Sequence, residues 1–189
     1  MISLVQLWLP ILLSAVGVFI ASSVLHMVLK FWHTPDYKGF PNEDEVRAAV
    51  RNGAPAPGIY MLPFCSMETM NTPETKQKLA EGPVGMMFLR GNGAVNMGVT
   101  LAQWFVFTLV VSLFAAYIAA VTLAAGTPEV QVFRVVATIT FMAYAFGAVP
   151  YGIWWGQPWA SLFKDVIDGL IYGLITGALF AWLWPAAAG

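Results

Sequence analysis

The chain carries little charge for its length. Only 10% of its 189 residues are charged and 59% are hydrophobic, which gives a mean hydropathy of +0.71. Soluble globular proteins have about 25% charged residues, so a chain of this composition cannot cover its apolar surface with polar side chains. Much of its exterior must therefore face lipid. The net charge of −1 creates no field that would attract a polyanion, and we expect no nucleic-acid partner.

The sequence is also poor in cysteine and in catalytic motifs. Cys65 is the single cysteine, which excludes an intrachain disulfide framework and a cysteine-rich zinc site. The sequence contains no P-loop, no HExxH pair and no nucleophile-elbow motif. No histidine stands beside a serine or a cysteine with an evident orienting acid. These absences favour a non-catalytic protein over an enzyme, and the sequence assigns no cofactor.

Long apolar runs are, by contrast, abundant. A helix needs about 20 apolar residues to cross the roughly 30 Å hydrocarbon core at about 1.5 Å per residue. Four runs reach that length, and they cover residues 4–29, 99–123, 130–151 and 162–184. The first lacks the basic leader and the short apolar core of a cleaved signal peptide, so we expect it to remain in the mature protein. The sequence therefore predicts an all-α membrane protein with a bundle of four transmembrane helices.

The segment between the first and second runs contains helix-capping and turn residues that are typical of a small folded unit. Asn42, followed by three acidic residues, predicts the start of a helix that ends at Gly53. Proline in the first turn and a Gly-Pro pair at the end predict a second helix over residues 73–81. The short apolar runs at residues 59–64 and 84–89 have the composition of strands that can pair. This segment is therefore predicted to be a small α+β insertion.

The chain is expected to divide into three parts: residues 1–30 form the first transmembrane helix, residues 31–98 the insertion, and residues 99–189 transmembrane helices 2–4. The basic residues predict how these parts are oriented in the membrane. If the crossings alternate, eight of the nine basic residues fall on one side, namely Lys30, Lys38, Arg47, Arg51, Lys76, Lys78, Arg90 and Lys164. Because basic residues favour the cytoplasm, the insertion should be cytoplasmic and both termini outside a plasma membrane or a bacterial-type inner membrane.

Small residues recur every four positions in two of the predicted helices. The stripe in the last helix consists of Gly169, Gly173, Gly177 and Ala181. The stripe in the second helix consists of Ser112, Ala116, Ala120 and Ala124. Stripes of this kind let two helix backbones approach closely. Packing within one chain is the favoured interpretation, and contact with another subunit or a second copy is the alternative.

Two carboxylates lie near the start of the last predicted helix. Asp165 and Asp168 are three residues apart and share a helix face, and Lys164 precedes Asp168 by four. Carboxylates inside a membrane are costly enough to suggest function, so a proton or cation site is one interpretation. The favoured alternative is an interfacial role, because both residues are within about two turns of the expected helix start, where water can reach them.

His26 and His33 form a further candidate pair. They are seven residues apart and would share a face if the first helix continued past Trp32, but Pro35 predicts that it ends nearby. A haem or chlorophyll-type ligand role is conceivable for such residues. The sequence shows no second intramembrane ligand that would support it, so ordinary interfacial histidines are favoured.

Sulfur-containing side chains gather in the insertion. Cys65, Met67 and Met70 follow one predicted strand, and more methionines occur on both strands, namely Met61, Met86 and Met87. Thiolate and thioether donors suit Cu(I), which makes the first three a candidate metal site. Flexible apolar packing explains the same residues without a metal and is the favoured interpretation.

Smooth helix faces and a folded insertion are more easily explained as docking surfaces than as catalytic equipment. The leading functional hypothesis is therefore a non-catalytic accessory or assembly subunit of a larger membrane complex. Its expected partners are the lipid bilayer and other membrane-protein subunits or further copies of the chain. A small oligomeric transporter or channel that uses Asp165 and Asp168 is the alternative, and a Cu(I)-binding membrane protein is the third.

Overall fold

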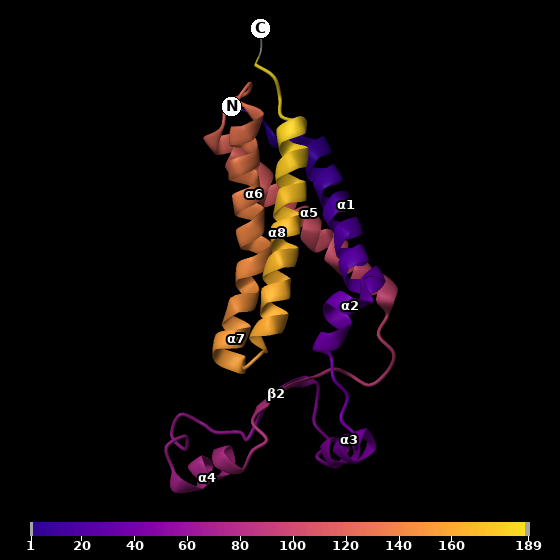
Figure 1. The fold of residues 1–189 in the computed structure, drawn as a ribbon, viewed down its shortest axis with the longest axis vertical. Coiled ribbons are helices and arrows are strands. Elements are labelled where there is room, and N and C mark those ends of the chain that lie inside the picture. The colour runs from indigo at the N-terminus through magenta and orange to yellow at the C-terminus, as the bar shows by residue number, and fades with distance from the viewer. Residues whose placement is uncertain (1, 188–189) are drawn as a thin grey trace. The chain divides into compact units, whose positions relative to one another are not determined.

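Four long apolar helices dominate the protein (Figure 1). The structure is a computed structural model, and it describes residues 2–187. Each of the four helices is long and apolar enough to cross a membrane; they span Leu4–Val28, Met97–Thr122, Glu129–Trp155 and Trp159–Trp182. The prediction of a four-helix membrane bundle is therefore confirmed, and the protein is a polytopic integral membrane protein.

The first span is not a uniform α-helix. It begins with the 3₁₀ turn η1 (Leu4–Leu7), continues as α1 (Trp8–Ser23) and ends in a π-helical turn, η2 (Val24–Val28). Leu29 then leaves the helical conformation with φ −82° and ψ 69°, and the short helix α2 (Lys30–His33) follows. The sequence predicted one helix through residue 29, because apolar periodicity does not distinguish a π turn from an α turn. Such turns are rare and occur frequently at functional sites.

The third span also changes its helical type near the end. It consists of α6 (Glu129–Ala145), the 3₁₀ turn η4 (Phe146–Ala148) and α7 (Val149–Trp155). Pro150 explains the interruption, since proline lacks a backbone N–H and its ring clashes with the carbonyl group four residues earlier. A tight connection leads from α7 into α8 (Trp159–Trp182).

Close packing of α8 on α6 is the main contact of the bundle, and Figure 1 shows these two helices side by side. The glycine stripe of α8 faces α6. A Cβ atom on Gly173 would lie 2.9 Å from the carbonyl oxygen of Ala137, and one on Gly177 would lie 2.7 Å from the Cβ of Ala137. On Gly169 the added Cβ would lie 2.9 Å from the Cβ of Ala145. Only glycine allows the two backbones to come this near.

The second small-residue stripe lies on α5 (Met97–Thr122) except for Ala124, which follows the end of this helix and is exposed, and the stripe serves a different contact. Its residues Ser112, Ala116 and Ala120 are buried. Helix α5 packs against α1 and α6, and α1 also packs against α8. The apolar core therefore forms where side chains from all four spans meet, with Leu7, Phe180 and Val132 among its fully buried members.

The insertion contributes most of a second compact unit, which comprises Lys38–Ala94 together with Trp154–Gly156. Its helices and strands are α3 (Glu43–Asn52), β1 (Gly58–Leu62), α4 (Pro73–Glu81) and β2 (Gly85–Leu89). The strands are antiparallel, with Gly58 opposite Leu89 and Leu62 opposite Gly85. The predicted helices and the strand pair of the insertion are therefore confirmed.

The ends of both insertion helices follow from their sequences. Thr72 accepts a hydrogen bond from the backbone N–H of Thr75 at the start of α4, and Gly82 ends that helix with φ 64°, a conformation that favours glycine. Asn42 precedes α3 as expected, but it makes no side-chain cap. Its amide instead donates to the Glu45 carboxylate at 3.0 Å, so the acidic first turn is stabilised from outside the helix.

Candidate metal centre

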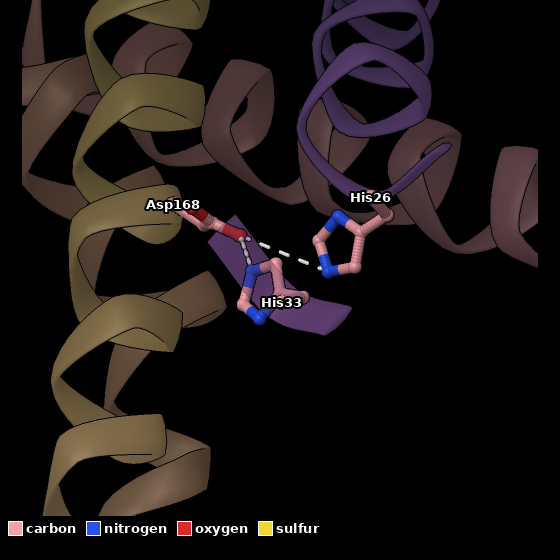
Figure 2. A group of neighbouring side chains, drawn as sticks. All are labelled: His26, His33 and Asp168. Carbon is pink, nitrogen blue, oxygen red and sulfur yellow. Dashed lines mark hydrogen bonds and ion pairs between the residues drawn. The ribbon is translucent and has the colours of Figure 1, made fainter. Parts of the chain in front are cut away.

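Two histidines from the end of the first span and its continuation meet an aspartate of the last span, which is far from them in the sequence (Figure 2). His26 comes from η2, His33 from α2 and Asp168 from α8. Each offers one ligand atom, and these atoms all lie within 4.8 Å of one another. All three belong to the membrane-spanning compact unit.

Asp168 is the centre of the cluster and is only 3% exposed. Its Oδ2 atom lies 2.8 Å from His33 Nε2 and 3.7 Å from His26 Nε2. Its Oδ1 atom accepts a hydrogen bond from Trp32 Nε1 at 2.8 Å. The indole therefore holds the carboxylate in place and leaves Oδ2 directed toward the two imidazole rings.

His33 lies between two carboxylates. Its Nε2 atom faces Asp168, and its Nδ1 atom lies 3.2 Å from Asp36 Oδ2. Lys164 Nζ donates to Asp36 Oδ1 at 2.6 Å, and this hydrogen bond from the ammonium group holds the pKa of the Asp36 carboxyl below its usual range. Because an ionised carboxylate only accepts hydrogen bonds, His33 Nδ1 carries a hydrogen.

His26 is fixed in a similar way from its own helix. Its Nδ1 atom lies 3.1 Å from the carbonyl oxygen of Ser22, which can only accept, so this nitrogen also carries a hydrogen. In the neutral ring the lone pair is then on Nε2, the atom that faces Asp168. The His26 side chain is 46% exposed and borders a hollow of about 300 Å³ that Trp104 also lines.

The local backbone explains how two histidines seven residues apart come together. The π turn and the break at Leu29 separate the two helical segments, and the imidazole rings of His26 and His33 stack with centroids 4.2 Å apart and planes 15° apart. On α8, Lys164 and Asp168 are one turn apart. Asp168 binds the start of the segment 32–36 and Lys164 binds its end. Lys164 Nζ also donates to the Trp32 carbonyl oxygen at 2.6 Å, which further ties α2 to α8.

The charge of this cluster favours a cation. Asp36 and Asp168 are negative and Lys164 is positive, so with neutral imidazoles the group carries one net negative charge. Two imidazole nitrogens and one carboxylate oxygen form a donor set that suits zinc and related divalent ions. The hydrogen bonds on both Nδ1 atoms match the outer contacts that orient histidine ligands at metal sites.

The two carboxylates predicted as a pair have different surroundings. Asp168 joins the cluster, whereas Asp165 is partly buried and lies 3.4 Å from the Gln157 amide through its Oδ2 atom. We expected water to reach both side chains because they are near the start of the helix. Asp168 is instead covered by protein, since Trp32 and His33 contact it from α2.

The predicted copper ligands lie in the insertion unit. Cys65 is partly buried, whereas Met67 is 85% exposed and Met70 is 44% exposed. Met61 and Met86 are opposite each other on the paired strands. A Cu(I) site at Cys65, Met67 and Met70 remains a prediction.

The sequence pattern points to both histidines and Asp168 but does not connect them. It gives no direct signal for Trp32 and Asp36 as partners of the cluster, and it shows Lys164 only as a neighbour of Asp168. His33 and Asp168 are 135 residues apart in the sequence. The available signals were the short spacings on each side, three residues from His33 to Asp36 and four from Lys164 to Asp168, which place each pair on one side of its segment.

Comparisons with known proteins give no match, whether to a family model, to a curated protein or to a solved structure.

Proposed function

We propose that this polytopic membrane protein binds a divalent transition-metal ion of the zinc class through His26 Nε2, His33 Nε2 and Asp168 Oδ2. One observation carries the proposal: both histidines have Nδ1 hydrogen-bonded to an acceptor, so both Nε2 atoms face one carboxylate oxygen and can bind a cation through the lone pairs of the neutral rings. Two lone pairs and a carboxylate oxygen repel one another unless a cation or a proton lies among them.

The distances fit an ion with a small adjustment. Zinc lies about 2.0 to 2.2 Å from imidazole nitrogen and carboxylate oxygen, so the donor atoms of a tetrahedral site are about 3.4 Å apart. The separations from Asp168 Oδ2, 2.8 Å to His33 and 3.7 Å to His26, lie on either side of that value. The stacked rings must turn apart, because an ion lies in the plane of each ring that binds it. His26 is the more exposed and makes this rotation.

Protonation of His33 is the competing account of the same contacts. An imidazolium ring would donate to Asp36 and Asp168 at once, as a purely structural bridge. That account leaves unexplained why the Nε2 atom of His26 also faces Asp168, with its Nδ1 atom already bound to Ser22. A metal ion uses both histidines.

Metal titration of the purified full chain tests the proposal. After treatment with a chelator, the detergent-solubilised protein should bind about one Zn²⁺ per chain, measured by calorimetry and by elemental analysis. His33→Gln and Asp168→Asn should abolish this stoichiometric binding. Asp165→Asn is the matched control, since it removes a carboxylate one turn earlier on the same helix and should bind normally. Absence of binding by the wild type, or equal binding by all variants, would refute the metal site.

His26→Ala tests the site at a more exposed position, because loss of binding by the two buried variants can also result from unfolding. His26 is half-exposed, so its truncation should leave thermal melting of the metal-free protein almost unchanged. It should weaken Zn²⁺ binding by about tenfold or more, because even residues that only orient a ligand contribute about 10- to 100-fold. An unchanged affinity would remove His26 from the site.

An accessory or assembly role has less support than the metal site. The glycine stripe of α8 motivated that hypothesis, and α6 of the same chain occupies this stripe along Gly169, Gly173 and Gly177. The transporter alternative keeps Asp168 as part of the metal cluster, but Asp165 lies outside it. Transport of the bound ion would be a further step, and only the binding site itself has geometric support.

The distribution of basic residues supports a cytoplasmic insertion and external termini. A cysteine introduced at Ala187 tests this orientation in a Cys65→Ser background. We expect a membrane-impermeant thiol reagent to label Ala187→Cys from outside intact cells. Labelling only after the cytoplasmic side is exposed would reverse the orientation.

A further inference from the structure

Three of the four arginines of the chain gather at one hollow of the insertion unit. The hollow has a volume of about 660 Å³. Arg47 and Arg51 reach it from α3, and Arg90 reaches it from the residue that follows β2. Apolar side chains such as Val50 and Leu89 form part of its wall.

The charges at this hollow have few partners. Arg47 lies 3.5 Å from Asp44, and both side chains are largely exposed. Within residues 2–187, no salt bridge joins Arg51 or Arg90 to an acidic side chain. Arg47 and Arg51 are also one helical turn apart, and like charges at this spacing repel. A bound anion would relieve that repulsion.

The side chains at this hollow indicate the chemical class of the ligand. Guanidinium groups present several N–H donors in a fixed plane and bind phosphate with two parallel hydrogen bonds. Asn92 and Gly93 line the same hollow and add a side-chain amide and backbone N–H groups. The three arginines come from two different elements and line the same hollow.

We propose that the hollow lined by Arg47, Arg51 and Arg90 binds a phosphate monoester. The ligand is either the monoester headgroup of a lipid such as phosphatidic acid or a soluble phosphorylated molecule, since both present a phosphate group that can carry two charges. The apolar wall accommodates the carbon atoms next to the phosphate. This site is independent of the metal centre, because it belongs to the other compact unit and shares no residue with it.

Two probes distinguish the sources of the phosphate group. Glycerol 3-phosphate would be titrated into the full chain in detergent by calorimetry, and short-chain phosphatidic acid would be added to the same micelles for native mass spectrometry. Binding of both probes identifies a phosphate site open to soluble ligands, and binding of phosphatidic acid alone identifies a lipid headgroup site. Either result supports the proposal if binding depends on the arginines. If neither probe binds, the proposal is wrong.

Matched double variants test whether the arginines carry the binding. Arg51→Gln with Arg90→Gln should weaken it by about tenfold or more, because two charge-assisted interactions are lost. Lys38→Gln with Lys76→Gln removes the same charge from the same unit outside the hollow and should change affinity less than about twofold. Equal loss in both double variants would show nonspecific electrostatic attraction and overturn the site. Thermal melting confirms that each variant remains folded.

Discussion

The two compact units of the protein use charge in opposite ways. In the membrane-spanning unit, the side chains of His33 and Asp168 are buried and paired, and they are only 8% and 4% exposed. In the insertion the pair Arg47 and Asp44 is 62% and 99% exposed. A charge that loses its partner in water is quickly solvated, whereas one that loses its partner inside protein is not. Removing a charged side chain should therefore change the free energy of unfolding more in the membrane-spanning unit than in the insertion.

This difference also separates the two candidate sites. Burial around Asp168 fixes ligand atoms in advance, which suits a small ion that requires defined distances. Exposure around Arg51 and Arg90 leaves long side chains free to adjust, which suits a larger anion that several donors surround. Variants in each unit can test whether burial determines how much stability is lost when a side chain is changed.

The largest effect is expected at the buried carboxylate. Asp168→Ala leaves Trp32 Nε1 without its acceptor and removes the carboxylate oxygen that lies 2.8 Å from His33 Nε2. Breaking a buried pair by removing one partner typically costs about 3 to 5 kcal/mol. We expect a loss of this size in the free energy of unfolding of the metal-free protein, measured by reversible unfolding in mixed micelles.

Asp165→Ala is the control for that measurement, because its only described side-chain hydrogen bond is the long 3.4 Å contact with Gln157. It should cost much less than Asp168→Ala. Equal stability of Asp168→Ala and the wild type would show that the cluster does not hold α2 against α8.

A smaller but clear effect is expected from Gly173→Leu. The new side chain would meet the Ala137 carbonyl oxygen at 2.9 Å and the Phe141 backbone nitrogen at 3.0 Å, so α6 and α8 would have to separate. Overpacking of this kind costs about 1 to 3 kcal/mol. Leu174→Ala, at a neighbouring position that is 44% exposed, serves as the comparison in thermal melting. Unchanged melting of Gly173→Leu would show that this packing contributes little to stability.

Local signals in the sequence predicted most of the secondary structure. The lengths of the apolar runs predicted the four spans, because a bilayer imposes a minimum length on any helix that crosses it. Thr72, Pro73 and Gly82 delimit α4 through hydrogen-bonding and backbone preferences that act over a few residues. These effects do not depend on distant parts of the chain.

The candidate sites could not be predicted in the same way. His33 meets Asp168 only because α1 packs on α8 and the π turn redirects the chain before α2. Neither the helix pair nor the turn has a clear signature in the apolar pattern. The arginine hollow similarly requires Arg90 to reach the face of α3 that carries Arg51, which depends on how the strand pair packs inside the insertion.

The smallest effect is expected at an exposed ion pair of the insertion. Lys78 Nζ donates to Glu74 Oε1 at 2.6 Å and lowers the pKa of the Glu74 carboxyl. Because the pKa is lower in the folded state, the pair stabilises the protein above the unfolded value of about 4.3, and this contribution disappears as the pH falls through the folded value. Both side chains are more than half exposed, so solvent screens most of the interaction. Glu74→Gln should therefore leave thermal melting at pH 7 within experimental scatter and should only slightly flatten the decline in melting temperature as the pH falls below about 4.3. A large loss at neutral pH would show that exposed charges in the insertion matter as much as the buried cluster, which would contradict the difference between the two units.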